Sequence, residues 1–252
     1  MSADAASGRG EADLRFCAVI PTLDNPQTLP WVVEGVRYYL DDVLVCDDGS
    51  GPRARAVIDD LSRAGLVSVW RGGRNRGKGA AVQAGFRVAA ARGASHVLQV
   101  DADGQHDLAE IPVFLAAARR EPRALVLGYP VFDESAPRSR VRGRAVSRFW
   151  VDLEVGAGAI ADPLVGFRVY PLDAVLALRP MGDGMEFDTE VIVRLAWRGS
   201  PVVNLPVGVR YLTVAEGGVS HFRPVRDNVR ISWLHTRLFT RAMLRHAFAS
   251  RQ

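Results

Sequence analysis

The sequence has almost no lysine and little cysteine. Lys78 is the only lysine among 32 basic residues, and arginine does not replace lysine where a compact point charge is needed. The two cysteines, Cys17 and Cys46, stand in the apolar runs FCAVI and VLVCDD. This setting predicts buried free thiols rather than a disulfide or a metal site, and it fits a reducing cytoplasm.

Long hydrophobic runs are also absent. No stretch approaches the roughly 18 apolar residues that indicate a membrane span, and the polar opening MSADAASGRGEAD lacks the apolar core of a signal peptide. The 252 residues, 48% of them hydrophobic, suffice for one large α/β core. We therefore expect a cytoplasmic chain with a disordered leader (1–14), one domain (15–225) and an amphipathic helical tail (226–252).

The excess of positive charge is small. The formal net charge is +4 and the isoelectric point is about 9.5. Such a balance is compatible with a phosphate-bearing substrate or an anionic membrane surface. It is too weak to indicate nucleic-acid binding, and nothing in the sequence indicates an oligomeric state.

Strand and helix patterns alternate over the first half of the chain. Continuous apolar runs that end in polar or turn residues predict strands at 16–22, 42–50, 66–73, 96–104 and 124–130. Between them, helical patterns occupy 26–40, 52–65, 78–93 and 107–122. This alternation predicts an α/β fold with an open, mostly parallel sheet covered by helices on both faces.

After residue 132 the pattern changes. An Arg-rich segment (132–150) predicts a loop followed by a helix, and strands are expected at 162–171 and 200–212. A helix is expected at 184–199, a loop at 214–228 and a helical tail at 229–248.

The acidic residues fall at the ends of the predicted strands. The segments Thr22–Asn25, Asp47–Ser50 and Asp101–His106 each follow an apolar run, and ligands of open α/β sheets bind beyond the carboxyl ends of strands. Asp101 and Asp103 can aim oxygens at one hard cation, with a carbonyl oxygen from Gln105, in the manner of Mg²⁺ or Mn²⁺ sites. The alternative is a solvated turn in which the aspartates act as local caps.

Two further segments indicate nucleotide contacts. In CDDGS, a carboxylate can accept hydrogen bonds from a base or ribose while Gly49 and Ser50 turn the chain. In NRGKGAA, two glycines permit close backbone approach to a phosphate at a helix N-terminus, and Lys78 can add a charge. An ordinary strand-to-helix turn and a helix-starting loop are the plainer alternatives.

The segments VIPTLDN, VCDDGS, NRGKGAAVQAG, DADGQH and DPLVGFRVYP occur in this order. Together they resemble the family-two glycosyltransferases of the GT-A fold, in particular the polyprenyl-phosphate sugar synthase-like group, over about residues 16–225. The resemblance implies a metal-dependent, inverting transfer of a sugar from a nucleotide diphosphate-sugar to a lipid-linked or polyprenyl-phosphate acceptor. It implies peripheral placement on the inner face of the membrane, Mg²⁺ or Mn²⁺ as cofactor, and Asp101, Asp103 and Gln105 as ligands.

The resemblance also implies roles for other residues. The expected nucleotide-sugar contacts are Pro21, Thr22, Asp24, Asp47, Asp48, Lys78, Asp101, Ala102 and Asp103. Many relatives carry Gly-Ser-Arg where this chain has Gly128-Tyr129-Pro130, and Arg138, Arg140 or Arg144 could supply that phosphate contact instead. The expected acceptor or phosphate contacts are Arg144, Arg168, His221 and Arg223, because guanidinium groups bind phosphates in bidentate pairs.

A phosphate acceptor is already ionised, whereas a hydroxyl acceptor needs a general base. Asp188 and Glu190 in the segment EFDTE are candidates, as is Asp162 ahead of Gly166. The alternative for the helix pair is N-terminal capping. His221 can be either a metal ligand or an ordinary loop residue.

The tail carries arginines near one helical face and apolar residues on another, so it can lie in a membrane interface or dock on its own domain. A catalytically silent nucleotide-binding scaffold is the second function considered. A nucleotidyltransferase is the third, and it lacks the expected Gly-rich loop after the first strand.

Overall fold

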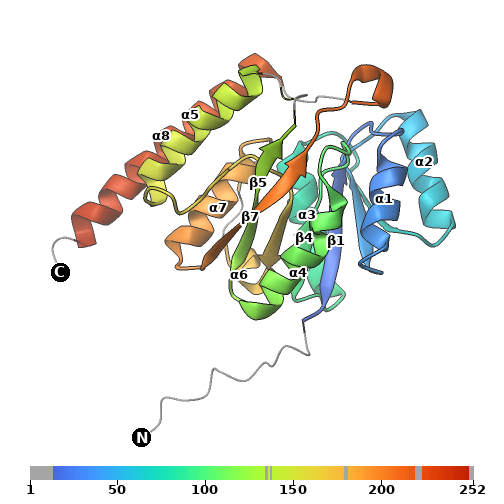
Figure 1. The fold of residues 1–252 in the computed structure, drawn as a ribbon, viewed down its shortest axis with the longest axis horizontal. Coiled ribbons are helices and arrows are strands. Elements are labelled where there is room, and N and C mark those ends of the chain that lie inside the picture. Colours follow the sequence, from blue (N-terminus) through green and yellow to red (C-terminus); the bar gives the residue numbers. More distant parts are fainter. Residues whose placement is uncertain (1–13, 134–135, 137, 179–180, 219–222, 250–252) are drawn as a thin grey trace, which may run out of the picture.

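A computed structural model of the chain describes residues 14–133, 136, 138–178, 181–218 and 223–249. Seven strands within these residues form one sheet in the order β3-β2-β1-β4-β6-β5-β7 (Figure 1). Their bounds are β1 (Phe16–Thr22), β2 (Val43–Asp47), β3 (Ser68–Arg71), β4 (His96–Gln99), β5 (Leu125–Phe132), β6 (Arg168–Pro171) and β7 (Val202–Val209).

The sheet is mostly parallel, which confirms the fold class predicted from the sequence. Strands β1, β2, β3 and β4 pair in parallel, as do β5 and β7. Only β6 runs antiparallel, to β4 on one side and to β5 on the other. The carboxyl ends of β1, β2 and β4 therefore meet at one edge.

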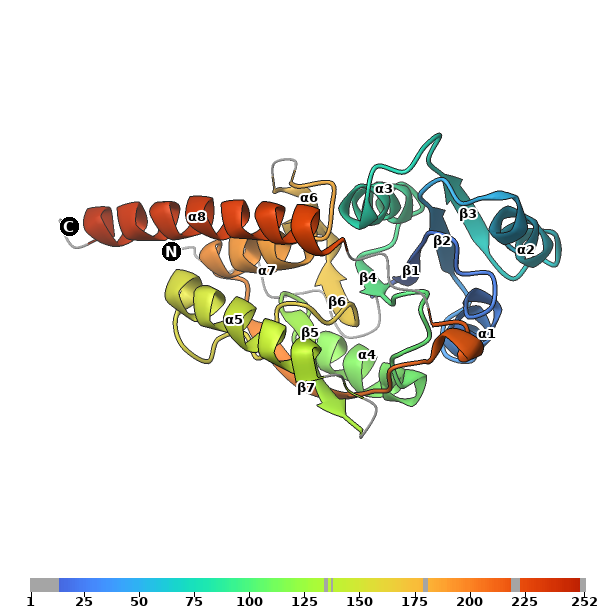
Figure 2. The same ribbon diagram turned by 90° about the horizontal axis from the view of Figure 1, so that it is seen from above.

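Helices cover both faces of the sheet (Figures 1 and 2). Their bounds are α1 (Leu29–Arg37), α2 (Pro52–Arg63), α3 (Lys78–Ala91), α4 (Ile111–Arg120), α5 (Arg138–Val155), α6 (Leu172–Leu176), α7 (Phe187–Trp197) and α8 (Pro224–Ala249), with short 3₁₀ turns η2 (Leu108–Glu110) and η3 (Val214–Glu216). None of the helices in the described ranges combines the length and apolarity needed to cross a bilayer.

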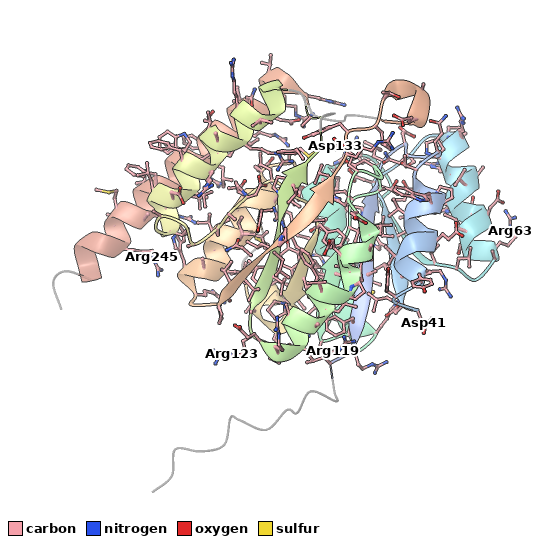
Figure 3. The ribbon with its side chains drawn as sticks, in the orientation of Figure 1. Asp41, Arg63, Arg119, Arg123, Asp133 and Arg245 are labelled. Atoms are coloured by element: carbon pink, nitrogen blue, oxygen red, sulfur yellow. The ribbon has the colours of Figure 1, made fainter. Side chains whose placement is uncertain are left out.

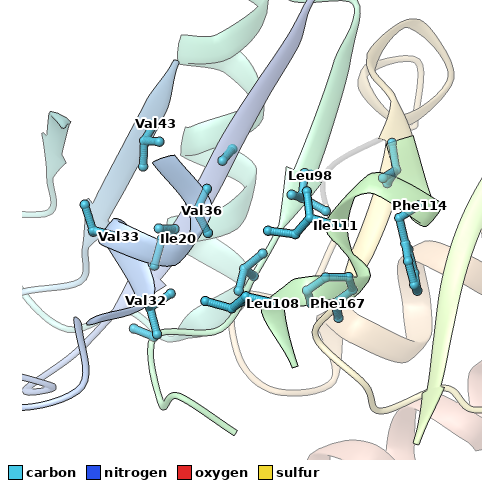
Figure 4. Packing of buried hydrophobic residues seen from close by; sticks show 14 of the residues in the cluster. Ile20, Val32, Val33, Val36, Val43, Leu98, Leu108, Ile111, Phe114 and Phe167 are labelled. Atoms are coloured by element: carbon cyan, nitrogen blue, oxygen red, sulfur yellow. The ribbon is translucent and has the colours of Figure 1, made fainter. Parts of the chain in front are cut away.

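Alternation along the strands divides the interior into two clusters. Ala18 and Ile20 of β1 face the cluster under α1, α2 and α4, part of which Figure 4 shows, whereas Cys17 and Val19 face the cluster under α3, α5, α6, α7 and α8. Successive side chains of a strand point to opposite faces, so a strand apolar throughout needs helices on both sides. Cys17 is buried and free, as predicted, and so is Cys46.

Helix α1 illustrates how the sequence determines the packing. Its buried residues, Leu29, Val32, Val33 and Val36, recur at the spacing of one helical face. Val32, Val33 and Val36 lie against β1 and β2 in Figure 4.

Helix α3 lies unusually close to the sheet. A Cβ built on Gly85 would be 2.6 Å from the Val19 side chain and 2.8 Å from the sulfur of Cys46. Only a glycine permits this approach. The close packing fixes where α3 begins, and its first residue is Lys78.

Helix α8 docks on its own domain. It begins at Pro224, inside the segment expected to be a loop, and lies beside α5 (Figure 2). Leu234 and Leu238 are buried in the second core cluster. A carboxylate oxygen of Glu154 in α5 and the ring nitrogen Nδ1 of His235 form a hydrogen bond of 2.8 Å. Both side chains are buried.

Candidate functional site

A cavity of about 1400 Å³ opens at the carboxyl edge of the sheet. Its floor comes from the ends of β1, β2 and β4, and the loop before α3 borders it. Residues of α5, residues of the first half of α8, and Asp188 of α7 also line it. Pro21 and Thr22 line it, as expected from their position at the end of β1.

The segment after β4 brings the two predicted metal ligands into this cavity. Asp101, Ala102, Asp103 and Gln105 all line it. The chain turns at Gly104, whose φ is +70° and where a Cβ would lie 2.8 Å from the Trp31 ring. An Asp103 oxygen accepts a 3.1 Å hydrogen bond from the backbone N–H of Gln105, which holds this turn.

Lys78 lies between two carboxylates instead of standing free for a phosphate. Its ammonium is 2.8 Å from the Asp101 carboxylate and 2.7 Å from that of Asp188. Burial disfavours the charged Lys78, but the two carboxylates outweigh it and raise its pKa. Nothing in the sequence pairs residue 78 with residue 188, because this contact depends on how α3 and α7 pack.

The two aspartates after β4 differ electrostatically. Burial disfavours the ionised Asp101, yet the Lys78 charge overcomes it and lowers the pKa of Asp101. Burial, followed by the negative charge of Asp101, raises the pKa of Asp103. Three carboxylates, those of Asp101, Asp103 and Asp188, therefore lie close to two cationic side chains, Lys78 and Arg168.

The backbone also fits the Asp101 carboxylate closely. A Cβ on Gly166 would lie 2.1 Å from an Asp101 oxygen. Glycine at this position leaves the space that the carboxylate fills. Sequence reasoning missed this role of Gly166 because the contact joins two loops far apart in the chain.

Of the aspartates expected to contact the nucleotide, some line the cavity and others do not. Asp48 lines the cavity, and its carboxylate accepts hydrogen bonds from the backbone N–H groups of Arg76 at 3.0 Å and Gly77 at 2.7 Å. Burial raises the pKa of Asp48, although these two hydrogen bonds act to lower it. Asp47 and Asp24 lie outside the cavity, where each accepts a loop N–H: Ser50 at 2.8 Å and Gly51 at 2.7 Å, respectively.

Of the three carboxylates expected as general bases, only Asp188 lines the cavity. Glu190 instead accepts the backbone N–H of Gly182 at 2.9 Å and pairs with Arg194 at 3.2 Å. It stands outside the cavity because it lies two residues further along α7. Helix α7 has no side-chain cap at its first turn, so the capping alternative does not account for Asp188.

Asp162 also lies outside the cavity. It accepts the backbone N–H groups of Leu164 and Val165 at 2.8 and 2.9 Å, and it pairs with Arg144 at 2.7 Å. Arg144 itself lines the cavity, and its guanidinium stands over the Phe132 ring. The turn at Asp162 therefore positions an arginine at the cavity wall.

Arg168 does not face an acceptor. Its side chain is fully buried, and its guanidinium donates to the backbone oxygens of Val165, Pro163 and Asp188 and to the Tyr170 hydroxyl. Strand β6 lies inside the sheet between β4 and β5, so this side chain points into the core. The structure thus does not bring it to the position expected for a phosphate contact.

Arg223, another expected acceptor contact, immediately precedes α8. Arg223 lines the cavity and is exposed, and its backbone N–H donates to Asp227 at 2.7 Å. Arg226 and Arg230 line the cavity on the next turns. His221 lies outside the described residues.

His106 is a cavity residue to which sequence reasoning gave no role. It is buried, and its Nδ1 has no hydrogen-bond partner among the described residues. Burial lowers its pKa, although the nearby charges of Asp103 and Asp101 oppose this. Its place five residues after Asp101, in the same loop, is the signal that could have identified it.

The donor set fits a hard divalent cation only with help from a ligand. No group of three or more histidine, cysteine, aspartate or glutamate side chains is arranged to hold a metal in the described ranges. Two carboxylates are what Mg²⁺ commonly takes from a protein when substrate phosphates and water supply the rest. Asp101 and Asp103 meet that description.

Residues 17–169 match the family model for glycosyl transferase family 2. This match spans more than half of the chain. The chain belongs to glycosyl transferase family 2. The resemblance inferred from the sequence motifs is confirmed, and the matched region of this family-2 chain carries Asp48, Asp101 and Asp103.

Two relatives of this family-2 chain act on lipid phosphates according to their names. The polyprenol monophosphomannose synthase of Mycolicibacterium smegmatis is 30% identical over 227 residues, which cover 82% of this chain and 80% of that protein. The undecaprenyl-phosphate mannosyltransferase of Micrococcus luteus is 28% identical over 214 residues, covering 77% of this chain and 83% of that protein.

Solved structures share the fold of this family-2 chain. The glucosyl-3-phosphoglycerate synthase of Mycobacterium tuberculosis in complex with UDP superposes with a TM-score of 0.68 at 18% identity, covering 92% of this chain and 81% of that one. Its complex with Mn²⁺ and UDP-glucose has a TM-score of 0.66, with 88% and 76% covered. These likenesses confirm the GT-A fold.

Proposed function

We propose that this family-2 chain transfers a sugar, with inversion, from a nucleotide diphosphate-sugar to a polyprenyl phosphate or a similar membrane-borne phosphate. The observation that carries the proposal is the pair Asp101 and Asp103 after β4, which line a cavity that arginines of α8 also line. A carboxylate pair suits a metal-bound diphosphate, and arginines suit a second anion. The activities named for the two bacterial relatives support the same assignment.

The donor would lie along the strand ends. The nucleoside would approach Asp48, whose carboxylate already orders the backbone of Arg76 and Gly77. The diphosphate would lie next to Asp101 and Asp103, which would hold Mg²⁺ or Mn²⁺ with it. When bound, the cation would neutralise the charge that develops on the departing nucleoside diphosphate. The metal-bound complexes of the synthase from M. tuberculosis support this choice of cation.

The carboxylates at the site favour an acceptor that is already ionised. Asp188 has the Lys78 ammonium at 2.7 Å and the Arg168 guanidinium at 3.8 Å, so taking a proton would discharge two ion pairs. Asp162 and Glu190 lie outside the cavity, and each is bonded to a backbone N–H and to an arginine. A phosphate oxygen needs no base, which agrees with these placements.

The reaction then balances without a proton transfer. A phosphate oxygen of the acceptor attacks the anomeric carbon and forms the new C–O bond. The bond from that carbon to the diphosphate oxygen breaks, and its electron pair leaves with the nucleoside diphosphate. Arg144, Arg223 and Arg226 at the cavity wall would orient the acceptor phosphate.

The test is transfer by the purified full chain. We would incubate it with undecaprenyl phosphate in detergent and with labelled GDP-mannose or UDP-glucose, in Mn²⁺, Mg²⁺ or EDTA, and measure labelled lipid. We expect metal-dependent labelling that Asp103→Asn abolishes and that the exposed Asp60→Asn variant retains. Nucleotide-sugar binding without any transfer or hydrolysis would support a catalytically silent scaffold instead.

A further inference from the structure

Exposed apolar side chains gather on two helices. Of the 15 large hydrophobic side chains that are exposed in the described part of the chain, nine belong to α5 and α8. Figure 2 shows these two helices side by side along one side of the molecule. Scattered exposed apolar residues are normal, whereas a contiguous group marks an interaction surface.

On α5 the exposed residues form a continuous stripe. Arg142, Val146, Phe149 and Leu153 are exposed and follow one another at spacings of four, three and four, which places them on one helical face. Phe149 is 58% exposed. The buried Val151 lies on the opposite side and belongs to the second core cluster.

On α8 the same arrangement recurs. Val225, Val229 and Trp233 are exposed at spacings of four, and Trp233 is 63% exposed. Leu234 and Leu238, on the opposite side, are buried in the same core cluster as Val151 of α5. Both stripes therefore point away from one shared core. We call this surface the outer face, consisting of Val146, Phe149, Leu153, Val225, Val229, Trp233, Met243 and Leu244.

The two helices that carry the outer face are rich in arginine. Helices α5 and α8 together contain ten arginines and three carboxylates, a charge of +7, whereas the whole chain carries +4. The rest of the chain is therefore net negative by three charges. On α8, Arg237 and Arg241 are exposed at the border of the apolar stripe. Apolar residues with basic residues beside them are the pattern of helices that lie in a membrane interface.

The catalytic cavity reaches this same surface. Val146, 60% exposed, belongs to the outer face and also lines the cavity. Ser232 and Thr236 of α8 are likewise exposed and line the cavity from the other helix. A head group held at the outer face would therefore meet the cavity where α5 and α8 border it.

We propose that the outer face docks on an anionic lipid bilayer. Its apolar side chains enter the head-group region, and the arginines beside them contact lipid phosphates. The occupant is a bilayer because both apolar insertion and excess positive charge complement an anionic lipid surface. The inference rests on the proposed function in one respect, since a lipid-borne acceptor would then enter the cavity from the membrane.

The test is sedimentation of the full chain with vesicles. We expect binding to vesicles of phosphatidylcholine with 30% phosphatidylglycerol and at least about tenfold weaker binding to pure phosphatidylcholine, because each basic group at an anionic surface contributes. Raising NaCl from 0.1 to 0.5 M should weaken binding to the anionic vesicles. The triple variant Phe149→Ser/Val229→Ser/Trp233→Ser should lose roughly tenfold or more.

Matched variants separate lost insertion from lost folding. Tyr38→Ser removes an aromatic side chain that is 83% exposed beyond the end of α1 and should bind like the wild type. Trp233→Phe keeps an apolar ring and should retain most of the binding, whereas Trp233→Ser should not. Circular dichroism melting of each variant checks the fold.

Three outcomes would overturn the inference. These are wild-type protein that stays in the supernatant with anionic vesicles, a triple variant that sediments like the wild type, and a wild-type dimer that the triple variant dissociates. The last would assign the outer face to a second copy. Transfer to a short, water-soluble polyprenyl phosphate, assayed without vesicles, tests the proposed function separately. Turnover without vesicle binding would refute only the membrane inference. Vesicle binding without turnover would refute only the proposed enzymatic function.

Discussion

Replacing Lys78 by methionine should strongly destabilise the metal-free protein. The ammonium of Lys78 lies 2.8 Å from Asp101 and 2.7 Å from Asp188, and the three side chains are 14%, 20% and 7% exposed. Removing one partner of a buried ion pair leaves an uncompensated charge and costs about 3–5 kcal/mol. For a chain of this size that corresponds to a melting temperature lower by roughly 6–20 °C.

The cost should lie near the lower end of that range. Arg168 stands 3.8 Å from Asp188 and keeps a partial counter-charge there. Asp101 loses more, because its closest described cation is Lys78 and its like-charged neighbour Asp103 remains. Asp101 should therefore take up a proton in the variant at a higher pH than in the wild type.

This difference makes the destabilisation depend on pH. In the wild type the pKa of Asp101 is lowered, so its contribution to stability is present above the ordinary carboxyl pKa of about 3.9 and is lost as pH falls through the lowered value. The pKa of Lys78 is raised, so its contribution is complete at neutral pH and is lost only when pH rises above about 10.4. The free-energy gap between variant and wild type should thus be largest near pH 7 and should narrow below about pH 4.

Urea unfolding in EDTA, followed by tryptophan fluorescence at pH 7.5 and pH 3.5, measures this gap. Arg63→Met provides the matched control, because Arg63 pairs with Asp60 and both side chains are about two-thirds or more exposed. Figure 3 shows Arg63 at the surface. That variant should change the free energy of unfolding by less than about 1 kcal/mol. Equal urea midpoints for Lys78→Met and wild type at pH 7.5, or a gap that is the same at both pH values, would refute the reasoning.

Three further predictions concern single groups. Asp103→Asn should lower kcat/KM for sugar transfer by roughly 100-fold or more, and a normal kcat/KM would contradict the role of Asp103 as a metal ligand. The melting temperature of this variant in EDTA should be unchanged or higher. Burial and the Asp101 charge raise the pKa of Asp103 and so make its ionised form unfavourable in the wild type. Gly166→Ala should cost about 1–3 kcal/mol in urea unfolding and reduce transfer, since its Cβ would lie 2.1 Å from Asp101. Gly143→Ala, inside α5, meets no atom within 4 Å and should be neutral or slightly stabilising. Equal destabilisation by the two substitutions would argue against the steric account. Burial raises the pKa of the Cys17 thiol to about 12, so its reaction with a disulfide reagent at pH 8 should follow the rate of unfolding, and rapid modification of the folded chain would disprove that burial.

The fold and one part of the site were predictable because they depend on short-range patterns. A continuous apolar run such as FCAVI can be buried on both faces only in a sheet with helices on each side. Asp101 and Asp103 follow such a run directly, so the sheet alone determines that they reach the carboxyl edge. Asp48 follows β2 in the same way and also lines the cavity.

The sequence does not decide which of the other acidic residues face the cavity. Asp188 and Glu190 both lie in the first turn of α7, yet one reaches Lys78 and the other bonds to Gly182. The two-residue separation turns their side chains to different sides of the helix, and which side faces the cavity depends on how α7 packs. The family resemblance implies a place at the acceptor for Arg168, but β6 is an inner strand, where an arginine must satisfy its donors within the core.

The acidic and the basic sides of the cavity are built on different parts of the fold. Its acidic side is built on β1, β2 and β4, which are paired with neighbours and covered by a helix that Gly85 allows to pack closely. Its basic side depends on α8, which is held by core contacts and by the buried pair of Glu154 and His235. The proposed donor contacts therefore lie at the strand ends and on the loop before α3. The proposed acceptor contacts and the outer face instead depend on α5 and α8. A change in the position of α8 would alter the acceptor site and the proposed membrane contact together and leave the carboxylates after β4 in place.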